Sequence, residues 1–130
     1  MEAAAVLAQP IRVLIADDHD LFTVAIEALL AGEGRIAIAG RARDGKEAVE
    51  LARTLRPDVV LMDISMPVID GIEATELITA GDEAPCVLVL TGSDAPLDVD
   101  RARRAGAAGY VTKDRIAADL VGAIRGIASR

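Results

Sequence analysis

Aromatic side chains are nearly absent from this chain of 130 residues, which contains one phenylalanine, one tyrosine and no tryptophan. A site that stacks a flavin or nucleic-acid bases between rings needs more aromatic surface than this. Hydrophobic residues nevertheless make up 52% of the chain. We therefore expect an interior built from valine, isoleucine, leucine and alanine, and no ligand held by ring stacking.

Cysteine and long apolar runs are also scarce. Cys86 is the single cysteine, so the chain cannot form an internal disulfide, and its composition fits a reducing compartment. Because free cysteine is usually a small buried hydrophobic residue, we expect Cys86 to be buried. No apolar run reaches the roughly 18 residues of a membrane helix, and residues 1–9 lack the basic start of a secretory signal. These absences predict a cytoplasmic protein with no membrane partner.

Positive charge is in deficit, because 14 lysine and arginine residues are set against 21 aspartate and glutamate residues, for a formal net charge of −7. An acidic chain is a poor partner for a phosphate backbone, so we expect DNA contact only through a separate domain. The length suits one domain. We expect residues 1–9 to be a flexible lead-in and residues 10–130 to form that domain.

Short apolar runs alternate along the chain with amphipathic patterns. The apolar runs cover residues 13–16, 36–39, 59–62, 87–90 and 109–111. Apolar residues recur every three to four positions, as on one face of a helix, in residues 21–29, 48–55 and 116–127. The pattern is weaker in 71–80 and 95–105. Near-continuous apolar strands need a sheet that is covered on both faces. The alternation therefore predicts an α/β domain in which a parallel sheet lies between helices.

Polar residues interrupt the pattern where predicted strands end. These residues are Asp17, Asp18, Asp63, Thr91 and Lys113. In open α/β sheets, ligands bind beyond the carboxyl ends of strands where the strand order reverses. If the first and third strands are neighbours there, three carboxylates converge and need a cation, and oxygen ligands suit Mg²⁺. A threonine hydroxyl and a lysine could stabilise a transferring phosphoryl group, and an aspartate could accept it.

Each of these residues also has a simpler interpretation. Asp17 or Asp18 could cap the first helix, Asp63 could be a turn residue, and Thr91 could be a strand or turn residue. Lys113 could be an ordinary solvated lysine. The phosphoryl-transfer interpretation is favoured because all five occur together, each at the same end of its strand.

The sequence resembles the receiver domains of bacterial two-component response regulators, over about residues 10–130. The matching stretches are 13–19 (VLIADDH), 57–67 (PDVVLMDISMP), 70–75 (DGIEAT), 90–92 (LTG) and 106–113 (GAAGYVTK). Their details are most similar to receivers that precede a LuxR-type helix-turn-helix output domain. The resemblance implies a flavodoxin-like (βα)5 three-layer sandwich with strand order 2-1-3-4-5.

The resemblance also implies roles for the acidic residues. Asp63 would accept a phosphoryl group from a cognate histidine kinase. Asp63, Asp18 and the backbone carbonyl of Ser65 would ligate Mg²⁺, and Asp17 would act through a bound water. The domain would not be an enzyme beyond catalysing its own phosphorylation and dephosphorylation.

The remaining implied roles concern signalling. Lys113 would pair with Asp63 and then with the phosphoryl group, and Thr91 would hydrogen-bond a phosphoryl oxygen. Tyr110 would change rotamer in response. The surface so altered would control a transcriptional output domain or another partner, and phosphorylation could drive homodimerisation.

The chain departs from the family pattern at a few positions. Asp114 follows the lysine where many receivers have a proline in a cis peptide, and residues 68–69 are Val-Ile in a loop where glycine is common. Thr23 and Leu77 stand where the LuxR-linked subtype often has arginine. These differences bear on the shape of the loop and on partner contacts.

Two other functions compete with this interpretation. Asp18-His19-Asp20 is similar to the Asp-x-Asp motif of haloacid-dehalogenase-like phosphatases, in which Asp18 would be the nucleophile. A pseudo-receiver that binds partners without phosphate is the other alternative. We expect His19 to be a helix-start residue beside the pocket and not an acid–base group, although histidine titrates near neutral pH.

Overall fold

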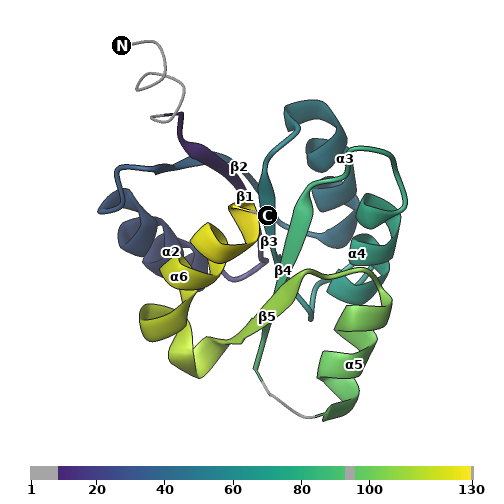
Figure 1. Ribbon diagram of the computed structural model, residues 1–130. Helices are drawn as coiled ribbons and strands as arrows, with labels where there is room; N and C mark the ends of the chain where they lie inside the picture. The colour runs from purple at the N-terminus through teal and green to yellow at the C-terminus, as the bar shows by residue number, and fades with distance from the viewer. Residues whose placement is uncertain (1–8, 93–95, 130) are drawn as a thin grey trace.

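The computed structural model describes residues 9–92 and 96–129. The strands are β1 (Ile11–Ala16), β2 (Ile36–Ala42), β3 (Val59–Asp63), β4 (Cys86–Thr91) and β5 (Gly109–Thr112). The helices are α2 (Asp20–Ala31), α3 (Gly45–Leu55), α4 (Gly71–Thr79), α5 (Pro96–Arg104), the 3₁₀ helix η1 (Lys113–Arg115) and α6 (Ile116–Ala128). Figure 1 shows strands and helices alternating along the chain, as the sequence pattern predicts. The predicted lead-in, residues 1–9, falls almost entirely outside the described residues.

The five strands form one parallel sheet in the order β2-β1-β3-β4-β5. The strand order reverses at β1, which lies between β2 and β3. The first and third strands are therefore neighbours, which is the condition under which we expect the three carboxylates to converge. The predicted flavodoxin-like topology is confirmed. Pairing of β1 with β2 is regular except for a one-residue register shift, since Val13 pairs with Ile38 but Leu14 pairs with Gly40.

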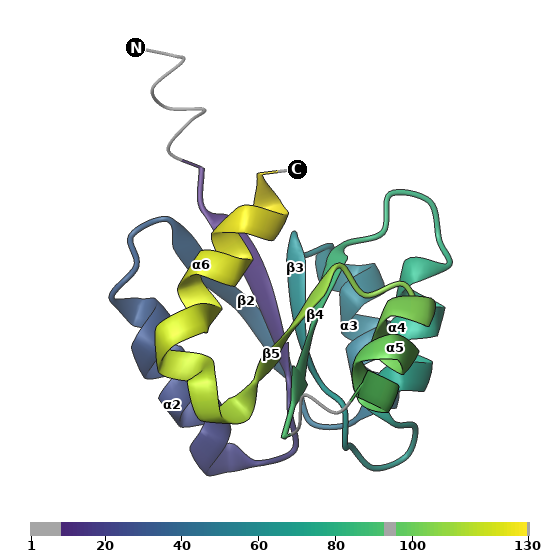
Figure 2. The ribbon, with the colours of Figure 1, turned by 60° about the horizontal axis from the view of Figure 1, so that its bottom comes forward.

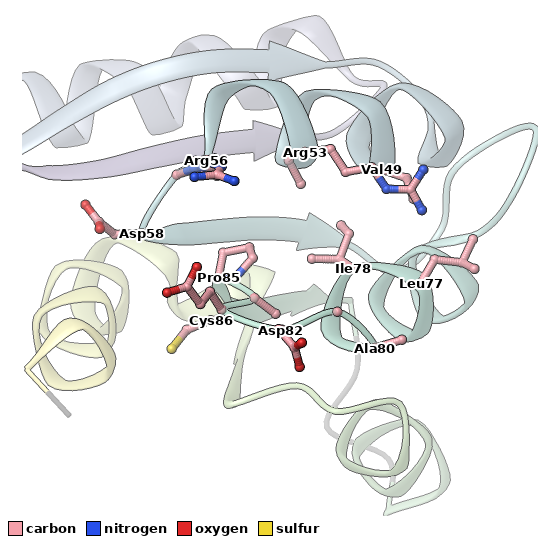
Figure 3. Close-up of a pocket in the computed structure, with 15 residues that line it drawn as sticks. Val49, Arg53, Arg56, Asp58, Leu77, Ile78, Ala80, Asp82, Pro85 and Cys86 are labelled. Atoms are coloured by element: carbon pink, nitrogen blue, oxygen red, sulfur yellow. The ribbon is translucent and has the colours of Figure 1, made fainter.

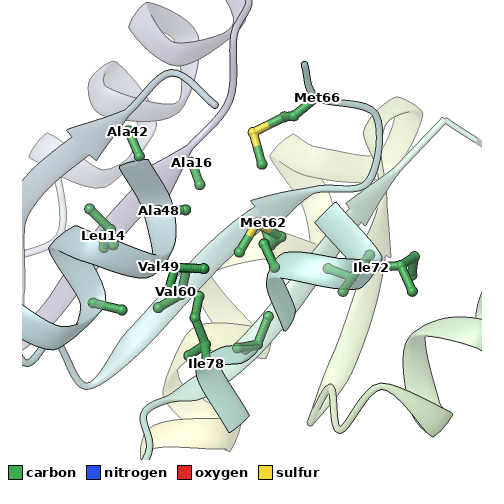
Figure 4. Packing of buried hydrophobic residues seen from close by; sticks show 14 of the residues in the cluster. Leu14, Ala16, Ala42, Ala48, Val49, Val60, Met62, Met66, Ile72 and Ile78 are labelled. Atoms are coloured by element: carbon green, nitrogen blue, oxygen red, sulfur yellow. The ribbon is translucent and has the colours of Figure 1, made fainter. Parts of the chain in front are cut away.

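Helices cover both faces of the sheet, as Figure 2 shows with α2 and α6 on one side and α3, α4 and α5 on the other. Alternate residues of β1 enter different cores, because successive side chains of a strand point to opposite faces. Val13 and Ile15 pack toward α2 and α6. Leu14 and Ala16 pack toward the other three helices, in the cluster drawn in Figure 4. Both cores are aliphatic, as the shortage of aromatic residues requires.

Side-chain caps fix where α3 and α4 begin. The Asp44 side chain accepts a hydrogen bond from the backbone N–H of Glu47 at 2.8 Å. The Glu47 carboxylate in turn accepts from the backbone N–H of Arg43, the residue before the cap, at 2.8 Å. Asp70 caps α4 by accepting from Glu73 at 2.9 Å. These caps anchor the helices that follow β2 and β3.

Two departures from expectation are local. Cys86 is only half-buried and packs at the border of the core, not within it, because it is the first residue of β4 and lies at the open end of the sheet. The turn after β5 forms the short helix η1 before α6 begins.

No helix of the described residues is long and apolar enough to cross a membrane.

One residue in the loop between β3 and α4 adopts a backbone conformation suited to glycine but is a valine. Val68 adopts a φ of +72°, a left-handed value that a β-branched residue rarely takes. Its side chain is 71% exposed, so little packing compensates for the strain. Val68 is therefore a candidate site of backbone strain in this loop.

Replacing Val68 with glycine is expected to raise the free energy of unfolding by about 1 kcal/mol, because glycine adopts positive φ without a Cβ clash but gains more freedom when unfolded. Urea denaturation of wild type and Val68→Gly measures the difference. Val24→Gly is the control, because Val24 is also exposed but lies inside α2, where glycine should lower stability by a similar amount. Lower stability of Val68→Gly would contradict the prediction.

Candidate functional site

The polar residues at the ends of the strands meet at one edge of the sheet. Asp17 directly follows β1, Asp63 and Thr91 are the last residues of β3 and β4, and Lys113 directly follows β5. Asp17, Asp63 and Thr91 are buried. Because the strands are parallel and adjacent, their carboxyl ends lie together and bring these side chains to one place. The predicted convergence is therefore observed.

Lys113 is directed into this group. Its Nζ lies 3.1 Å from Oδ1 of Asp63 and 3.8 Å from Oδ2 of Asp17, and its side chain is 25% exposed. Nζ also lies 4.7 Å from the centre of the Phe22 ring, a cation–π contact from α2. The simpler interpretation of Lys113 as a solvated lysine is wrong, because three partners hold its ammonium group over the acidic residues.

Asp17, Asp18 and His19 form the turn between β1 and α2. The Asp17 side chain accepts from the backbone N–H of His19 at 2.7 Å. Nδ1 of His19 lies 3.2 Å from an oxygen of Asp17 and 3.2 Å from an oxygen of Asp18. His19 itself is the N-cap residue of α2 and makes no side-chain capping bond. His19 thus begins the helix as expected and neither aspartate is the cap, but its ring joins the acidic group, which the sequence did not indicate.

Asp63 is an unusual carboxylate because it is 1% exposed. Its Oδ1 accepts from the backbone N–H of Ser65 at 3.2 Å. Burial raises the pKa of the Asp63 carboxyl above its ordinary value, and the Asp17 carboxylate raises the pKa further, whereas Lys113 lowers it. The charged form of Asp63 is therefore poorly stabilised by the protein alone.

The chemistry of the group fits a divalent cation. Single atoms from Asp17, Asp18, His19 and Asp63 all lie within 4.8 Å of one another. Oδ2 of Asp17 and Oδ2 of Asp63 are buried and have no hydrogen-bond partner. Buried polar atoms are nearly always paired in proteins, and carboxylate oxygens are the ligands of hard cations. A metal ion would complete the coordination that these two oxygens lack.

A glycine positions the backbone that carries Asp63. Gly71 donates from its N–H to the carbonyl of Ile64 at 3.0 Å. A Cβ on Gly71 would overlap the carbonyl oxygen of Asp63 and would approach Cα of Ile64 to 2.8 Å. Only glycine lets the start of α4 pack this tightly against the end of β3. Sequence reasoning noted Gly71 as part of a motif but missed this function.

The remaining residues noted in the sequence differ in their exposure to solvent. Ser65 is exposed in the loop after β3. Tyr110 lies on the edge strand β5 and is 43% exposed. Thr23 is buried in α2, and Leu77 is exposed on α4. Neither residue offers the charge of the arginine that is common at its position.

A separate cavity of about 830 Å³ lies at the opposite end of the sheet, between α3 and α4 (Figure 3). Arg53, Arg56, Asp82 and Pro85 are among its lining residues. It contains none of the predicted site residues. The candidate site is therefore the acidic group at the carboxyl end of the sheet, and not this cavity.

Comparison with known proteins identifies the family. Residues 13–125 match the family described as the response regulator receiver domain. The response regulator GacA of Pseudomonas viridiflava is 44% identical over 116 residues, which are 88% of this chain and 54% of that protein. A LuxR-family two-component response regulator from Aurantimonas sp. SI85-9A1 superposes with a TM-score of 0.87 at 36% identity, covering 93% of this chain and 86% of that one. The CheX–CheY–BeF3–Mg²⁺ complex from Borrelia burgdorferi gives a TM-score of 0.83 at 26% identity, covering 95% and 92%.

The chain belongs to the response regulator receiver domain family. It is a signalling module of two-component systems and not a classical metabolic enzyme. It spans about half the length of the curated relatives that it matches. This family membership removes the main support for the haloacid-dehalogenase-like alternative.

Proposed function

We propose that this domain accepts a phosphoryl group on Asp63 from a histidine kinase. The observation that carries the proposal is the Asp63 carboxylate, which is buried at the strand edge with one oxygen unpartnered and the other 3.1 Å from the Lys113 ammonium. In the transfer, an Asp63 oxygen would bond to phosphorus as the bond from phosphorus to the donor histidine nitrogen breaks. The product is an acyl phosphate.

The acidic group would hold Mg²⁺ during this reaction. Asp18, Asp63 and the carbonyl of Ser65 would ligate the ion, and Asp17 would act through a water. The unpartnered oxygens of Asp17 and Asp63 support this assignment, as does the presence of Mg²⁺ in the Borrelia CheY complex. When bound, Mg²⁺ supplies positive charge that offsets the repulsion between the carboxylates and the incoming phosphoryl group.

The side chains around Asp63 would then hold the phosphoryl group in place. The Lys113 ammonium would neutralise one phosphoryl oxygen, and the Thr91 hydroxyl would donate to another. Tyr110 would respond by changing rotamer at the half-exposed edge of the sheet. The same groups would catalyse only phosphorylation and dephosphorylation of the domain itself.

The altered surface would be the one formed by α5, β5 and α6. Phosphorylation there would control a separate output domain, through which alone the protein would contact DNA, or would favour a homodimer. LuxR-family regulators among the relatives support a transcriptional output. This is a local change of charge that biases a two-state element.

Intact-mass spectrometry after incubation with acetyl phosphate tests the proposal. We expect a single phosphoryl adduct on wild type that requires Mg²⁺, and none on Asp63→Asn, because the amide cannot accept the group. Asp82→Asn is the matched control, since it makes the same chemical change on an exposed loop at the other end of the sheet, and it should form the adduct normally.

The other outcomes point to the alternatives. No adduct on wild type under any condition would indicate a pseudo-receiver that binds partners without phosphate. Many turnovers of an added phosphoester that depend on Asp18 and not on Asp63 would restore the haloacid-dehalogenase-like alternative.

A further inference from the structure

His19 is the one member of the acidic group that is not an oxygen donor. Its Nδ1 lies 3.2 Å from carboxylate oxygens of Asp17 and Asp18, and 3.8 Å from Oδ2 of Asp63. The ring is therefore directed inward over all three aspartates, although the side chain is 62% exposed. Its position as N-cap does not explain this orientation, because the ring makes no capping bond.

An independent observation marks the same place as a site for an ion. Oδ2 of Asp63 and Oδ2 of Asp17 are buried without a hydrogen-bond partner. Nδ1 of His19 lies 3.8 Å from the Asp63 oxygen, which is too far for a hydrogen bond. An ion bound to these oxygens would have the imidazole nitrogen within reach as a further ligand.

We propose that His19 Nδ1 is a metal ligand in this site, so that the domain binds borderline ions such as Zn²⁺ and Co²⁺ more tightly than its carboxylates alone would allow. Imidazole is a preferred ligand of Zn²⁺ and other late first-row ions, whereas Mg²⁺ prefers oxygen ligands. His19 therefore adds affinity for the borderline ions and little for Mg²⁺. This inference rests on the proposed metal site and specifies which ions that site favours.

The first test compares metal affinities by calorimetry on protein without a polyhistidine tag. We expect His19→Gln to weaken Zn²⁺ and Co²⁺ binding by about 10-fold or more, and to weaken Mg²⁺ binding much less. Asp20→Asn is the control, because Asp20 is the next residue but pairs with Arg41 and lies outside the cluster. It should leave all three affinities unchanged.

The second test observes the ligand directly. Because the chain has one histidine, the ring nitrogen signals of a ¹⁵N-labelled sample belong to His19 alone. Zn²⁺ added at constant pH should shift the Nδ1 signal far more than the Nε2 signal, whereas Mg²⁺ should produce no such shift.

Zn²⁺ affinity that is equal in wild type and His19→Gln, or a shift at Nε2 only, would overturn the inference. Weakening of Zn²⁺ and Mg²⁺ to the same extent would also overturn it, because it would indicate a role in the shape of the turn and not in ligation. None of these results depends on phosphorylation. Failure of the proposed function would instead appear as a missing adduct on wild type with Mg²⁺, whatever the zinc result.

Discussion

Replacing Gly71 with alanine is expected to lower the free energy of unfolding by about 3 kcal/mol, at the upper end of what overpacking usually does. The added Cβ would overlap the carbonyl oxygen of Asp63 and lie 2.9 Å from its carbonyl carbon. These are backbone atoms at the buried end of β3, so they cannot move aside as a flexible side chain could. Relief of the clash requires α4 to move away from the end of β3.

The same displacement should affect the reaction at Asp63. Because a shift of about 1 Å at a reacting group can slow a reaction on the order of 100-fold, we expect the rate of adduct formation from acetyl phosphate to fall by a similar factor. Urea denaturation and time-resolved intact-mass measurements check the two effects on one sample. The rate is measured at a temperature at which circular dichroism shows the variant to be folded.

Gly122→Ala is the matched control. Gly122 lies inside α6, and a Cβ there would meet nothing within 4 Å. This variant should gain about 1 kcal/mol, since alanine is the better helix residue, and should form the adduct at the wild-type rate. A Gly71→Ala protein with wild-type stability and rate would show that the contact between α4 and β3 is looser than described.

Replacing Lys113 with methionine is expected to lower the free energy of unfolding at neutral pH by about 2 kcal/mol. Removing one partner of a fully buried ion pair costs about 3–5 kcal/mol, and the 25% exposure of Lys113 reduces this. Methionine retains the length of the side chain and its contact with Phe22. The loss should therefore report on charge: Asp63 and Asp17 would face each other without a counter-ion.

The loss should depend on pH in a defined direction. The pKa of Asp63 is already raised in the folded protein, and Lys113 works against that rise, so removing Lys113 raises the pKa further. A carboxyl with a raised folded pKa holds its proton longer when folded, so stability falls as pH increases from the ordinary unfolded pKa of about 4 through the folded value. The loss of stability caused by Lys113→Met should reach its full size at a pH above the folded pKa of Asp63. It should shrink as the pH falls below the unfolded pKa.

A double-variant cycle separates this cause from others. If the deficit reflects unpaired carboxylates, Lys113→Met should cost less in an Asp63→Asn background than in wild type, and saturating Mg²⁺ should also reduce it. A deficit that is the same at acid and neutral pH and in both backgrounds would indicate lost packing instead of lost charge.

The sequence predicts the fold and the meeting of the site residues for one physical reason. Five apolar runs separated by helical patterns require a covered parallel sheet, and residues that follow parallel strands share an edge. The orientation of side chains is a different matter. The family resemblance implies that Lys113 pairs with Asp63, but it does not show that the ammonium also approaches Asp17. Nothing in the sequence around His19 shows that its ring turns inward.

The close approach of Gly71 to the backbone of β3 also could not be predicted from the sequence. Gly71 is one of 11 glycines, and only the tertiary structure distinguishes it, by the overlap that a Cβ would create with the end of β3, from Gly122, where a side chain would be harmless. Val68 is the converse case. Glycine is common in this loop of the family, and here a valine adopts the left-handed backbone conformation that favours glycine.

The register shift in β2 decides which helix layer receives each side chain. Ile36 and Ala42 are an even number of positions apart, so strict alternation would turn both to the same face of the sheet. Ile36 instead packs with α2 and α6, whereas Ala42 packs with α3 and α4, because Ala39 has no partner between Ile38 and Gly40. The extra residue exchanges the faces to which the following side chains of β2 point. Arg41 therefore turns toward α2 and reaches Asp20 at the rim of the acidic site.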